Sequence, residues 1–243
     1  MKGSFKALLY RDIFLGRKQL KSATTMFFVA TALVVLILLS FRHGNLALLD
    51  KEIVEGAKIM IMPVVKFMPV LVACFLPNFV SEAVAREESG LWSKFRRSTP
   101  VSHWCFALAD YTLIFVFILL AFLVSAGYVA IICKIEGDAF DKRTIAIIVA
   151  LALCSLAFCI LMQIMTMLFK SVEIAGLAFT GAMMLAMFLY VFLAPETDMT
   201  NDEIFAKLGG FCEDILPFSP VIFISILLAG FCAAAMLYKR REK

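Results

Sequence analysis

Apolar residues dominate six separate stretches of this chain, and the charged residues gather between them. The stretches cover roughly residues 23–41, 58–81, 105–133, 144–169, 174–194 and 215–238. A membrane-spanning helix needs about 20 predominantly apolar residues, and the stretches have that length. None of them alternates apolar and polar residues with a period of two, which argues against barrel strands. The pattern predicts an all-α integral membrane protein with six transmembrane helices.

The composition agrees with that pattern. Hydrophobic residues make up 63% of the 243 residues, against about 45–50% in a typical soluble domain. Charged residues make up only 17%. The loops between the spans are too short to form a separate soluble domain, so residues 1–243 are predicted to be one transmembrane domain. We expect the lipid bilayer as its surroundings and no nucleic-acid partner.

The basic residues indicate how the spans are oriented. Of the 23 lysine and arginine residues, fifteen lie on the side that holds both termini, and seven lie on the other side. Basic loops remain in the cytoplasm. The sequence therefore predicts a multi-pass protein of the cell membrane with both termini in the cytoplasm.

The first 22 residues have the pattern of an amphipathic helix. Apolar residues share one broad face of residues 4–21 and basic residues share the other, although Asp12 interrupts the apolar face. Such a helix lies in the headgroup layer, with its cations near anionic lipid. The alternative is a basic topology signal that is helical without lying on the membrane.

The cytoplasmic segment between spans two and three is the most informative part of the chain. Its first half is helix-compatible and highly charged, and Leu91, Trp92 and Phe95 then form an apolar patch with basic neighbours. Pro100 ends the helical pattern. A short amphipathic helix of this kind lies either on the membrane or in a groove of a soluble partner, and the residues alone favour neither.

This segment resembles the type-2 family of ABC transporter permeases. The resemblance rests on Glu87-Glu88-Ser89-Gly90-Leu91-Trp92-Ser93-Lys94-Phe95, followed by Ser98-Thr99-Pro100-Val101-Ser102. The order of elements is also similar: an N-terminal interfacial helix, six spans, a charged cytoplasmic helix after span two, and an outer helical excursion between spans five and six. Asp110 departs from the family, whose members often carry lysine there.

The resemblance implies that residues 82–97 form a coupling helix, which docks into a separate ATPase subunit. The residues expected to contact the ATPase are Glu82, Arg86, Glu87, Glu88, Leu91, Trp92, Phe95, Arg96 and Arg97. The chain would be the transmembrane permease subunit of an ABC exporter, paired with a second permease copy or a similar permease. ATP and magnesium would bind in the partner ATPase. Small permeases of this character resemble exporters of the phenol-soluble modulin type, which implies a hydrophobic or amphipathic substrate such as a peptide or toxin.

Charged residues within the spans support an alternative function, an ion channel or a secondary transporter. Lys66 lies near the middle of span two and Asp110 near the inner end of span three, and Met62 and Phe67 complete the candidate pathway. Intramembrane charges often mark a transport pathway. Three structural interpretations remain open: Lys66 pairs with Asp110, Lys66 snorkels to the interface if the span is shifted, or Asp110 faces cytoplasmic water.

Several other functions find no support in the sequence. The motifs H-E-x-x-H and G-x-S-x-G are absent, as is a P-loop, so we expect no enzyme activity in this chain. His43 and His103 are predicted on opposite sides of the membrane, so no metal site is expected. Cys133 and Cys212 are the two cysteines that could meet on the outer side. Gly230 and Ala234 have the small-xxx-small spacing of closely packed helices.

Overall fold

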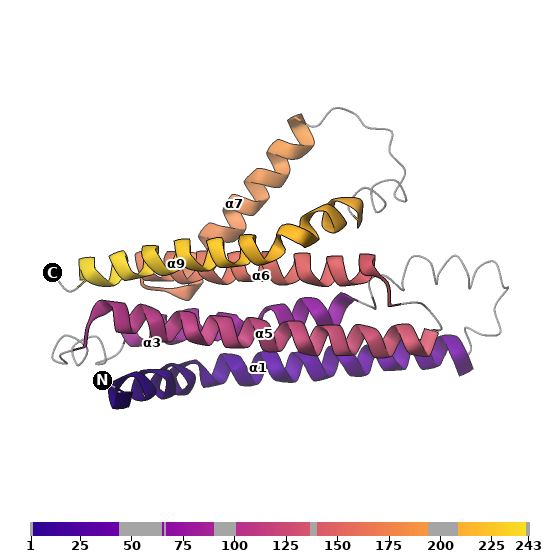
Figure 1. The fold of residues 1–243 in the computed structure, drawn as a ribbon, viewed down its shortest axis with the longest axis horizontal. Coiled ribbons are helices and arrows are strands. Elements are labelled where there is room, and N and C mark those ends of the chain that lie inside the picture. The colour runs from indigo at the N-terminus through magenta and orange to yellow at the C-terminus, as the bar shows by residue number, and fades with distance from the viewer. Residues whose placement is uncertain are drawn as a thin grey trace.

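The computed structural model describes residues 2–43, 65, 67–89, 101–136, 140–193 and 209–241, and nearly all of these residues are helical. Long helices lie side by side as an elongated bundle, with both termini at one end (Figure 1). Within these described residues, five helices are long and apolar enough to cross a membrane, and they cover Phe5–Ser40, Phe67–Glu87, His103–Ile135, Lys142–Phe169 and Gly209–Arg240. The prediction of an all-helical chain with several membrane-spanning helices is confirmed at this level.

Spans three, four and six correspond to long helices. Helices α5 (His103–Glu136) and α6 (Lys142–Phe169) contain the predicted ranges 105–133 and 144–169. The last candidate span begins at Gly209 and passes through the 3-10 turn η3 (Leu216–Phe218) into α9 (Ser219–Arg241). These helices extend beyond the predicted ranges because their charged ends continue the helix.

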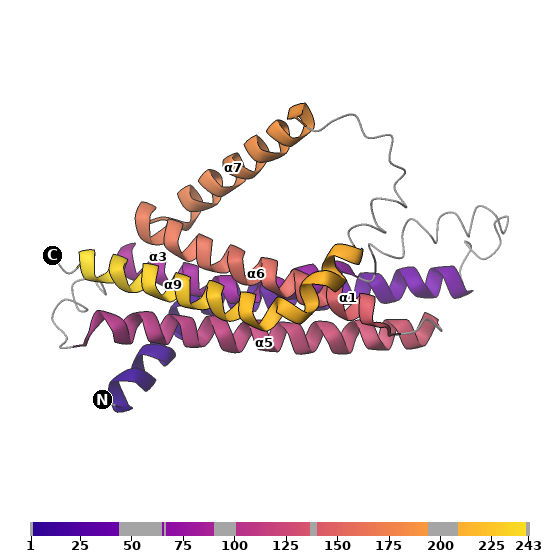
Figure 2. The same ribbon diagram turned by 45° about the horizontal axis from the view of Figure 1, so that its top comes forward.

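Predicted span five corresponds to α7 (Val172–Leu193), which leaves the bundle at a steep angle (Figures 1 and 2). Lys170, just after α6, adopts a left-handed backbone conformation with φ of 57°. Its backbone N–H donates to the carbonyl of Thr166 and so caps α6. This left-handed residue ends α6 and lets the chain turn into α7.

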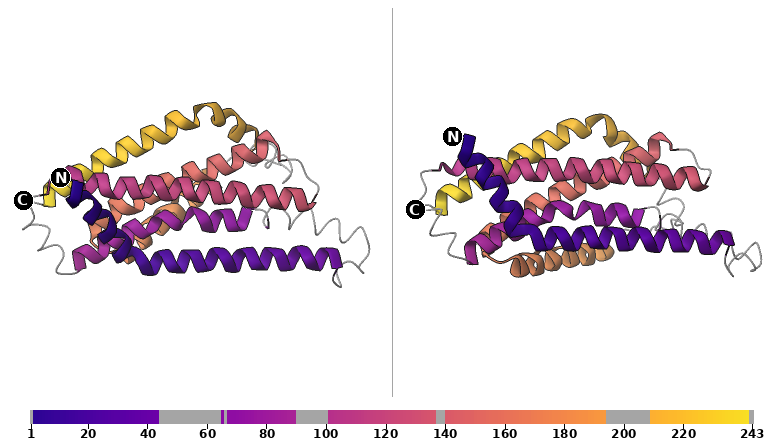
Figure 3. Two further views of the ribbon diagram at one scale, coloured as in Figure 1. Left: turned by 60° about the horizontal axis from the view of Figure 1, so that its bottom comes forward. Right: turned by 90° about the horizontal axis from the view of Figure 1, so that it is seen from below.

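The N-terminal segment and span one form a single helix, α1 (Lys2–His43). Residues 17–43 contain neither glycine nor proline, so nothing in the sequence breaks the helix between the predicted segments 1–22 and 23–41. Figure 3 shows that the N-terminal part of α1 lies at a steep angle to the remainder. The bend directs the start of α1 across the termini-bearing end of the bundle.

Span two consists of a helical stretch over residues 67–74, the 3-10 turn η2 (Leu76–Asn78) and α3 (Phe79–Ser89). Pro77 lies in η2, where the missing backbone N–H of proline favours a local change of helix type. The candidate span continues to Glu87, six residues past the predicted end at 81. The charged residues Glu82, Arg86 and Glu87 therefore belong to this helix, and they do not mark its end.

The main apolar core lies towards the end that holds the termini. Its large, fully buried side chains include Phe79, Phe106, Ile114, Leu156 and Tyr238. Two glycines bring helices close together around it. A Cβ atom at Gly16 would lie 2.6 Å from the Phe79 carbonyl oxygen, and one at Gly230 would lie 2.6 Å from the Tyr111 hydroxyl. Close packing at Gly230 and at the fully buried Ala234 confirms the small-xxx-small interpretation.

All seven cysteines are free thiols. Cys133 is buried near the end of α5, and Cys212 is buried near the start of the last span. The disulfide considered between them is not formed. The outer excursion over residues 201–208 lies outside the described residues.

Candidate functional site

Five helices each place polar side chains in one buried cluster near the termini-bearing end of the bundle. We call it the ionic cluster: Arg11 and Asp12 from α1, Glu87 from α3, Asp110 from α5, Gln163 from α6 and Tyr238 from α9. The carboxyl-bearing residues Asp12, Glu87 and Asp110 are only 1–2% exposed. Buried charges are stable only when they are paired and hydrogen-bonded, so this concentration is unusual in so apolar a chain.

Arg11 joins α1 to α3. Its Nη2 and Nε atoms donate to Oδ1 of Asp12 at 2.6 and 2.8 Å. Its Nη1 atom donates to Oε1 of Glu87 at 3.1 Å. The guanidinium also lies 5.2 Å from the centroid of the Phe106 ring. Removing Arg11 would leave the buried carboxyl group of Asp12 without the cation that it contacts.

The packing of α1 against α3 explains how Arg11 reaches Glu87. Gly16 lies five residues after Arg11 and has no side chain, so the Phe79 backbone approaches α1 closely there. Glu87 follows Phe79 by eight residues, slightly more than two helical turns, so both lie near one face of α3. Arg11 and Asp12 are adjacent and diverge by about 100° around α1. The two side chains bend towards each other and close the Arg11–Asp12 pair beside α3.

Asp110 joins α5 to α6 and α9. Its Oδ2 atom accepts hydrogen bonds from Gln163 Nε2 at 2.7 Å and from the Tyr238 hydroxyl at 2.6 Å. These contacts join residues 53 and 128 positions apart in the sequence. One carboxyl group therefore holds three membrane-spanning helices together from a position buried among them.

Three side-chain oxygens of the cluster have no hydrogen-bond partner among the described residues: Asp12 Oδ2, Asp110 Oδ1 and Gln163 Oε1. Two buried hydroxyl oxygens of residues that lie close to them in the sequence, Tyr111 Oη and Thr166 Oγ1, also have none there. Buried polar atoms in proteins are nearly always partnered, so each exception needs an explanation. Among the described residues, no group of three or more His, Cys, Asp or Glu side chains could hold a metal ion.

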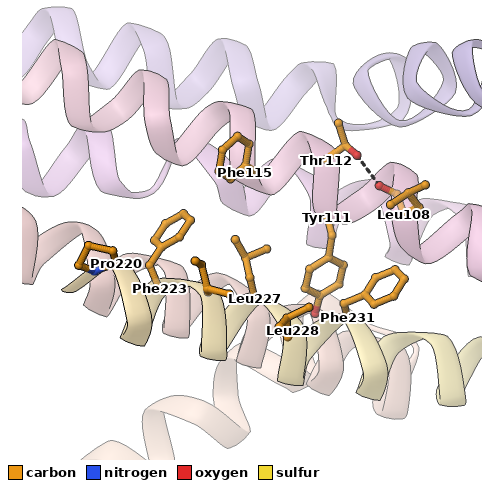
Figure 4. Close-up of a pocket in the computed structure, with 10 residues that line it drawn as sticks. Leu108, Tyr111, Thr112, Phe115, Pro220, Phe223, Leu227, Leu228 and Phe231 are labelled. Carbon is orange, nitrogen blue, oxygen red and sulfur yellow. Dashed lines mark hydrogen bonds between the residues drawn. The ribbon is translucent and has the colours of Figure 1, made fainter. Parts of the chain in front are cut away.

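A second feature lies beside the cluster, in an apolar groove between α5 and α9. The groove has a volume of about 630 Å³. Figure 4 shows Tyr111 reaching from α5 towards α9, beside Phe231. The lining is almost wholly apolar and rich in aromatic residues: Leu108, Tyr111, Thr112, Phe115, Pro220, Phe223, Ile224, Leu227, Leu228 and Phe231. We call this the α5–α9 groove.

The predicted ATPase-contacting residues fall into two groups. Glu82 and Arg86 form a partly exposed ion pair on α3, with Arg86 Nε 2.7 Å from Glu82 Oε1. Glu87 is buried, with its Oε1 atom 3.1 Å from Arg11 Nη1. Glu88 lies in α3. Leu91, Trp92, Phe95, Arg96 and Arg97 lie outside the described residues.

The structure describes two of the four candidate pathway residues, Asp110 and Phe67. Asp110 does not face cytoplasmic water, because it is 1% exposed and bonded to two other helices. Phe67 lies half-buried at the start of the span-two helix. Lys66 and Met62 lie outside the described residues, so the considered Lys66–Asp110 pair does too.

Sequence reasoning missed four of the six cluster residues. Arg11 counted only as one of the basic residues of the N-terminal segment, Asp12 was interpreted as a defect in an amphipathic face, and Gln163 and Tyr238 were not singled out. For the last three a signal was present: an acidic residue on an apolar face, a glutamine within a long apolar run, and a tyrosine at the end of a span. Intramembrane polar residues usually face protein, and this rule marks all three.

No family model matches this chain, and neither a curated protein nor a solved structure matches it.

Proposed function

We propose that this chain is the transmembrane permease subunit of an ATP-driven ABC exporter of the cell membrane. It would pair with a separate ATPase subunit and a second permease copy, with both termini in the cytoplasm. The observation that carries the proposal is the ionic cluster. It ties α3, which leads directly into residues 90–100, to helices α1, α5, α6 and α9. The resemblance of residues 87–102 to the family motif supports the same conclusion.

Contacts at both ends of α3 couple its movement to that of α1. Glu87 lies in the last turn of α3 and is held by Arg11, while Phe79 packs against Gly16 at the other end of the helix. A force applied to residues 90–100 by a closing ATPase would therefore move α3 and the start of α1 together. A buried ion pair resists separation because parting leaves uncompensated charge, so the two helices move as a unit.

Asp110 would carry this movement into the spans. The Arg11 guanidinium on α1 lies over the ring of Phe106 on α5, about one helical turn before Asp110. Asp110 is in turn bonded to Gln163 on α6 and Tyr238 on α9. A shift of α1 would therefore reach three spans through directional contacts, which transmit displacement better than apolar contacts that can slide.

The α5–α9 groove supports the proposed class of substrate. Its wall is apolar and aromatic, and several lining side chains are about half exposed, including Phe115, Ile224 and Leu228. A hydrophobic or amphipathic peptide presents a matching apolar face. The groove lies next to the cluster through the consecutive residues Asp110 and Tyr111, so movement of the cluster would change its width.

Co-purification tests the partnership most simply. The tagged chain is extracted from its native host in mild detergent, and co-purifying proteins are identified. We expect a P-loop ATPase with the native chain and its loss in the double variant Trp92→Ala, Phe95→Ala. Phe140→Ala is the matched control, because Phe140 is an exposed aromatic residue beyond the other end of α5. Failure to recover an ATPase with a folded, oligomeric chain would contradict the proposal.

The substrate class has its own test in reconstituted vesicles. With the ATPase present, amphipathic helical peptides should stimulate ATP hydrolysis and enter the vesicle lumen when ATP is added. Polar peptides of equal length are the control. A complex that hydrolyses ATP but responds to no amphipathic peptide would contradict the substrate assignment and leave the exporter assignment standing.

A secondary transporter is the second candidate, and the same cluster favours it. Buried carboxyl groups within membrane spans, such as Asp110, are typical of ion-coupled transport. Under this alternative, uptake or release in vesicles would follow an imposed ion gradient without ATP, and Asp110→Asn would abolish it. Transport that requires ATP and ignores the gradient would exclude the alternative.

A further inference from the structure

The first part of α1 packs its apolar face against the bundle of its own chain. Leu8 belongs to the main apolar core, and Phe5, Leu9 and Leu20 pack against that core. Asp12, on the same side of the helix, is 2% exposed. Protein therefore covers most of the face that the sequence pattern predicts to lie in the membrane. A contact between this segment and lipid has to involve the opposite face.

The opposite face is exposed and carries cations around two aromatic rings. Lys6, Tyr10, Phe14 and Arg17 follow one another at intervals of three or four residues, so they form one row along the helix. Tyr10 is 72% exposed and Phe14 is 47% exposed. The Arg17 guanidinium lies 4.3 Å from the centroid of the Phe14 ring. We call this exposed surface the outward face of α1, and it consists of Lys6, Tyr10, Phe14, Arg17, Lys18 and Lys21.

The charges on the outward face all have one sign. Asp12 is the only acidic residue among the first 22 residues, and it is buried on the other side of the helix. This part of α1 lies at a steep angle to the rest of the helix, at the end of the bundle that holds the termini (Figures 1 and 3). A helix that crosses the end of a transmembrane bundle in this way lies along the bilayer surface, at the depth of the lipid headgroups.

We propose that the outward face of α1 is a binding surface for the headgroups of anionic phospholipids. Its four cations contact the lipid phosphate groups, because basic side chains near a membrane surface attract anionic lipid. The rings of Tyr10 and Phe14 lie among the headgroups, where amphipathic aromatic side chains are enriched in membrane proteins. An acidic soluble protein would match the charge alone, whereas the aromatic rings and the placement of the helix favour the bilayer. The proposal rests on α1 and does not depend on the exporter assignment.

Lipid retention by the full-length chain tests this surface. The purified chain is reconstituted in vesicles that contain equal amounts of phosphatidylglycerol and phosphatidylcholine with matched acyl chains. It is then extracted in a mild uncharged detergent, and the lipids that remain bound are measured by mass spectrometry. We expect an excess of phosphatidylglycerol over phosphatidylcholine on the native chain. The excess should decrease at high ionic strength, because salt screens exposed charges.

The double variant Arg17→Gln, Lys18→Gln removes two cations of the outward face. Each cation near a membrane surface strengthens the binding of anionic lipid about fivefold, so the excess of phosphatidylglycerol should fall several-fold. Lys6→Gln, Lys21→Gln removes two other cations of the same face and should have a similar effect. All four side chains are exposed, and circular dichroism confirms that each variant is folded. The second pair keeps the test valid if the first variant misfolds.

The matched control is Lys134→Gln, Lys142→Gln, which removes two exposed cations at the other end of the bundle. The excess of phosphatidylglycerol should persist in this variant. A native chain without the excess, or a control that loses as much of it as the outward-face variants, would overturn the proposal. An excess that survives in both outward-face variants would show that this face contacts water or another protein, and it would overturn the proposal as well.

Discussion

The consecutive residues Asp110 and Tyr111 on α5 belong to two different regions of the molecule. Asp110 enters the ionic cluster and bonds to α6 and α9 at 2.7 and 2.6 Å. Tyr111 forms part of the α5–α9 groove, and its hydroxyl has no hydrogen-bond partner among the described residues. Both residues are almost completely buried. The same two helices therefore meet once through directional polar contacts and once through apolar surfaces.

The cluster and the groove therefore differ in how strictly they fix the positions of the helices. Buried charges and hydrogen bonds have narrow geometric tolerance, so the cluster fixes how five helices lie relative to one another. Apolar side chains tolerate repacking, so the groove can adapt its shape at small energetic cost. A protein that must move its helices together and yet admit varied apolar ligands needs both properties in neighbouring positions.

The largest effect is expected at Arg11. Arg11→Met keeps the side-chain volume but leaves Asp12 and Glu87 buried without their cation. Breaking a buried ion pair in this way costs about 3–5 kcal/mol of unfolding free energy. Unfolding of the purified chain by SDS titration measures the loss. Arg17→Met is the control, because Arg17 is exposed and stacks on Phe14. Equal, small losses in both variants would contradict the importance of the cluster.

Substitution of two tyrosines, one in the ionic cluster and one in the α5–α9 groove, compares the two regions directly. Tyr238→Phe removes one of the two donors to Asp110 and should lower the free energy of unfolding by about 1–3 kcal/mol, since a buried acceptor loses a hydrogen bond. Tyr111→Phe removes a hydroxyl that has no partner among the described residues, so it should be neutral or slightly stabilising. The same SDS titration measures both. A larger loss for Tyr111→Phe than for Tyr238→Phe would reverse the proposed difference between cluster and groove.

A smaller loss is expected at the contact between α1 and α3. The new methyl group of Gly16→Ala would lie 2.6 Å from the Phe79 carbonyl oxygen. Overpacking costs about 1–3 kcal/mol, and the gain in helix propensity of about 1 kcal/mol offsets part of it. Gly127→Ala is the control, because nothing lies within 4 Å of the new methyl group there. Gly127→Ala should be stabilising by comparison, and a stabilising Gly16→Ala would refute the close contact.

The smallest effect lies far from both regions, at the start of α6. Asp141 caps α6 by accepting from the backbone N–H of Thr144 at 2.8 Å and from its hydroxyl at 2.7 Å. These bonds lower the pKa of Asp141 below its ordinary value. Asp141→Ala removes this N-cap and should lower the free energy of unfolding by about 1 kcal/mol.

The stabilisation that Asp141 gives to the start of α6 depends on pH. A carboxyl group whose pKa is lowered by folding stabilises the chain above its unfolded pKa, and this stabilisation disappears as the pH falls. Melting temperatures of the wild type and Asp141→Ala should therefore converge in acid. A difference that grows in acid would contradict the capping role.

The sequence was sufficient to predict the helices but not the contacts between them. The long apolar runs at 105–133 and 144–169 predict α5 and α6 because a bilayer-length apolar run in a membrane has to be helical. The helix of span two does not end at the predicted limit of 81, where the charged residues Glu82, Arg86 and Glu87 begin. Two of these charges pair with each other and the third with Arg11, so the helix continues to Ser89.

The cluster itself depends on long-range contacts that no local pattern contains. Arg11 and Glu87 are 76 positions apart, and Asp110 and Tyr238 are 128 positions apart. Periodicity assigns each residue to a helix face, but it does not indicate which faces meet. Polar residues on otherwise apolar faces, such as Asp12 and Gln163, are the local signal that a partner exists.

A double-mutant cycle between Arg11 and Glu87 tests the central claim most directly. Unfolding free energies are measured for the wild type, Arg11→Met, Glu87→Met and the double variant under one set of conditions. A direct buried ion pair predicts that the double variant loses less than the two single losses combined, with a coupling energy of about 1–3 kcal/mol. Losses that add within about 0.5 kcal/mol would show that the two residues do not interact, and would contradict the account of α1 and α3 as one moving unit.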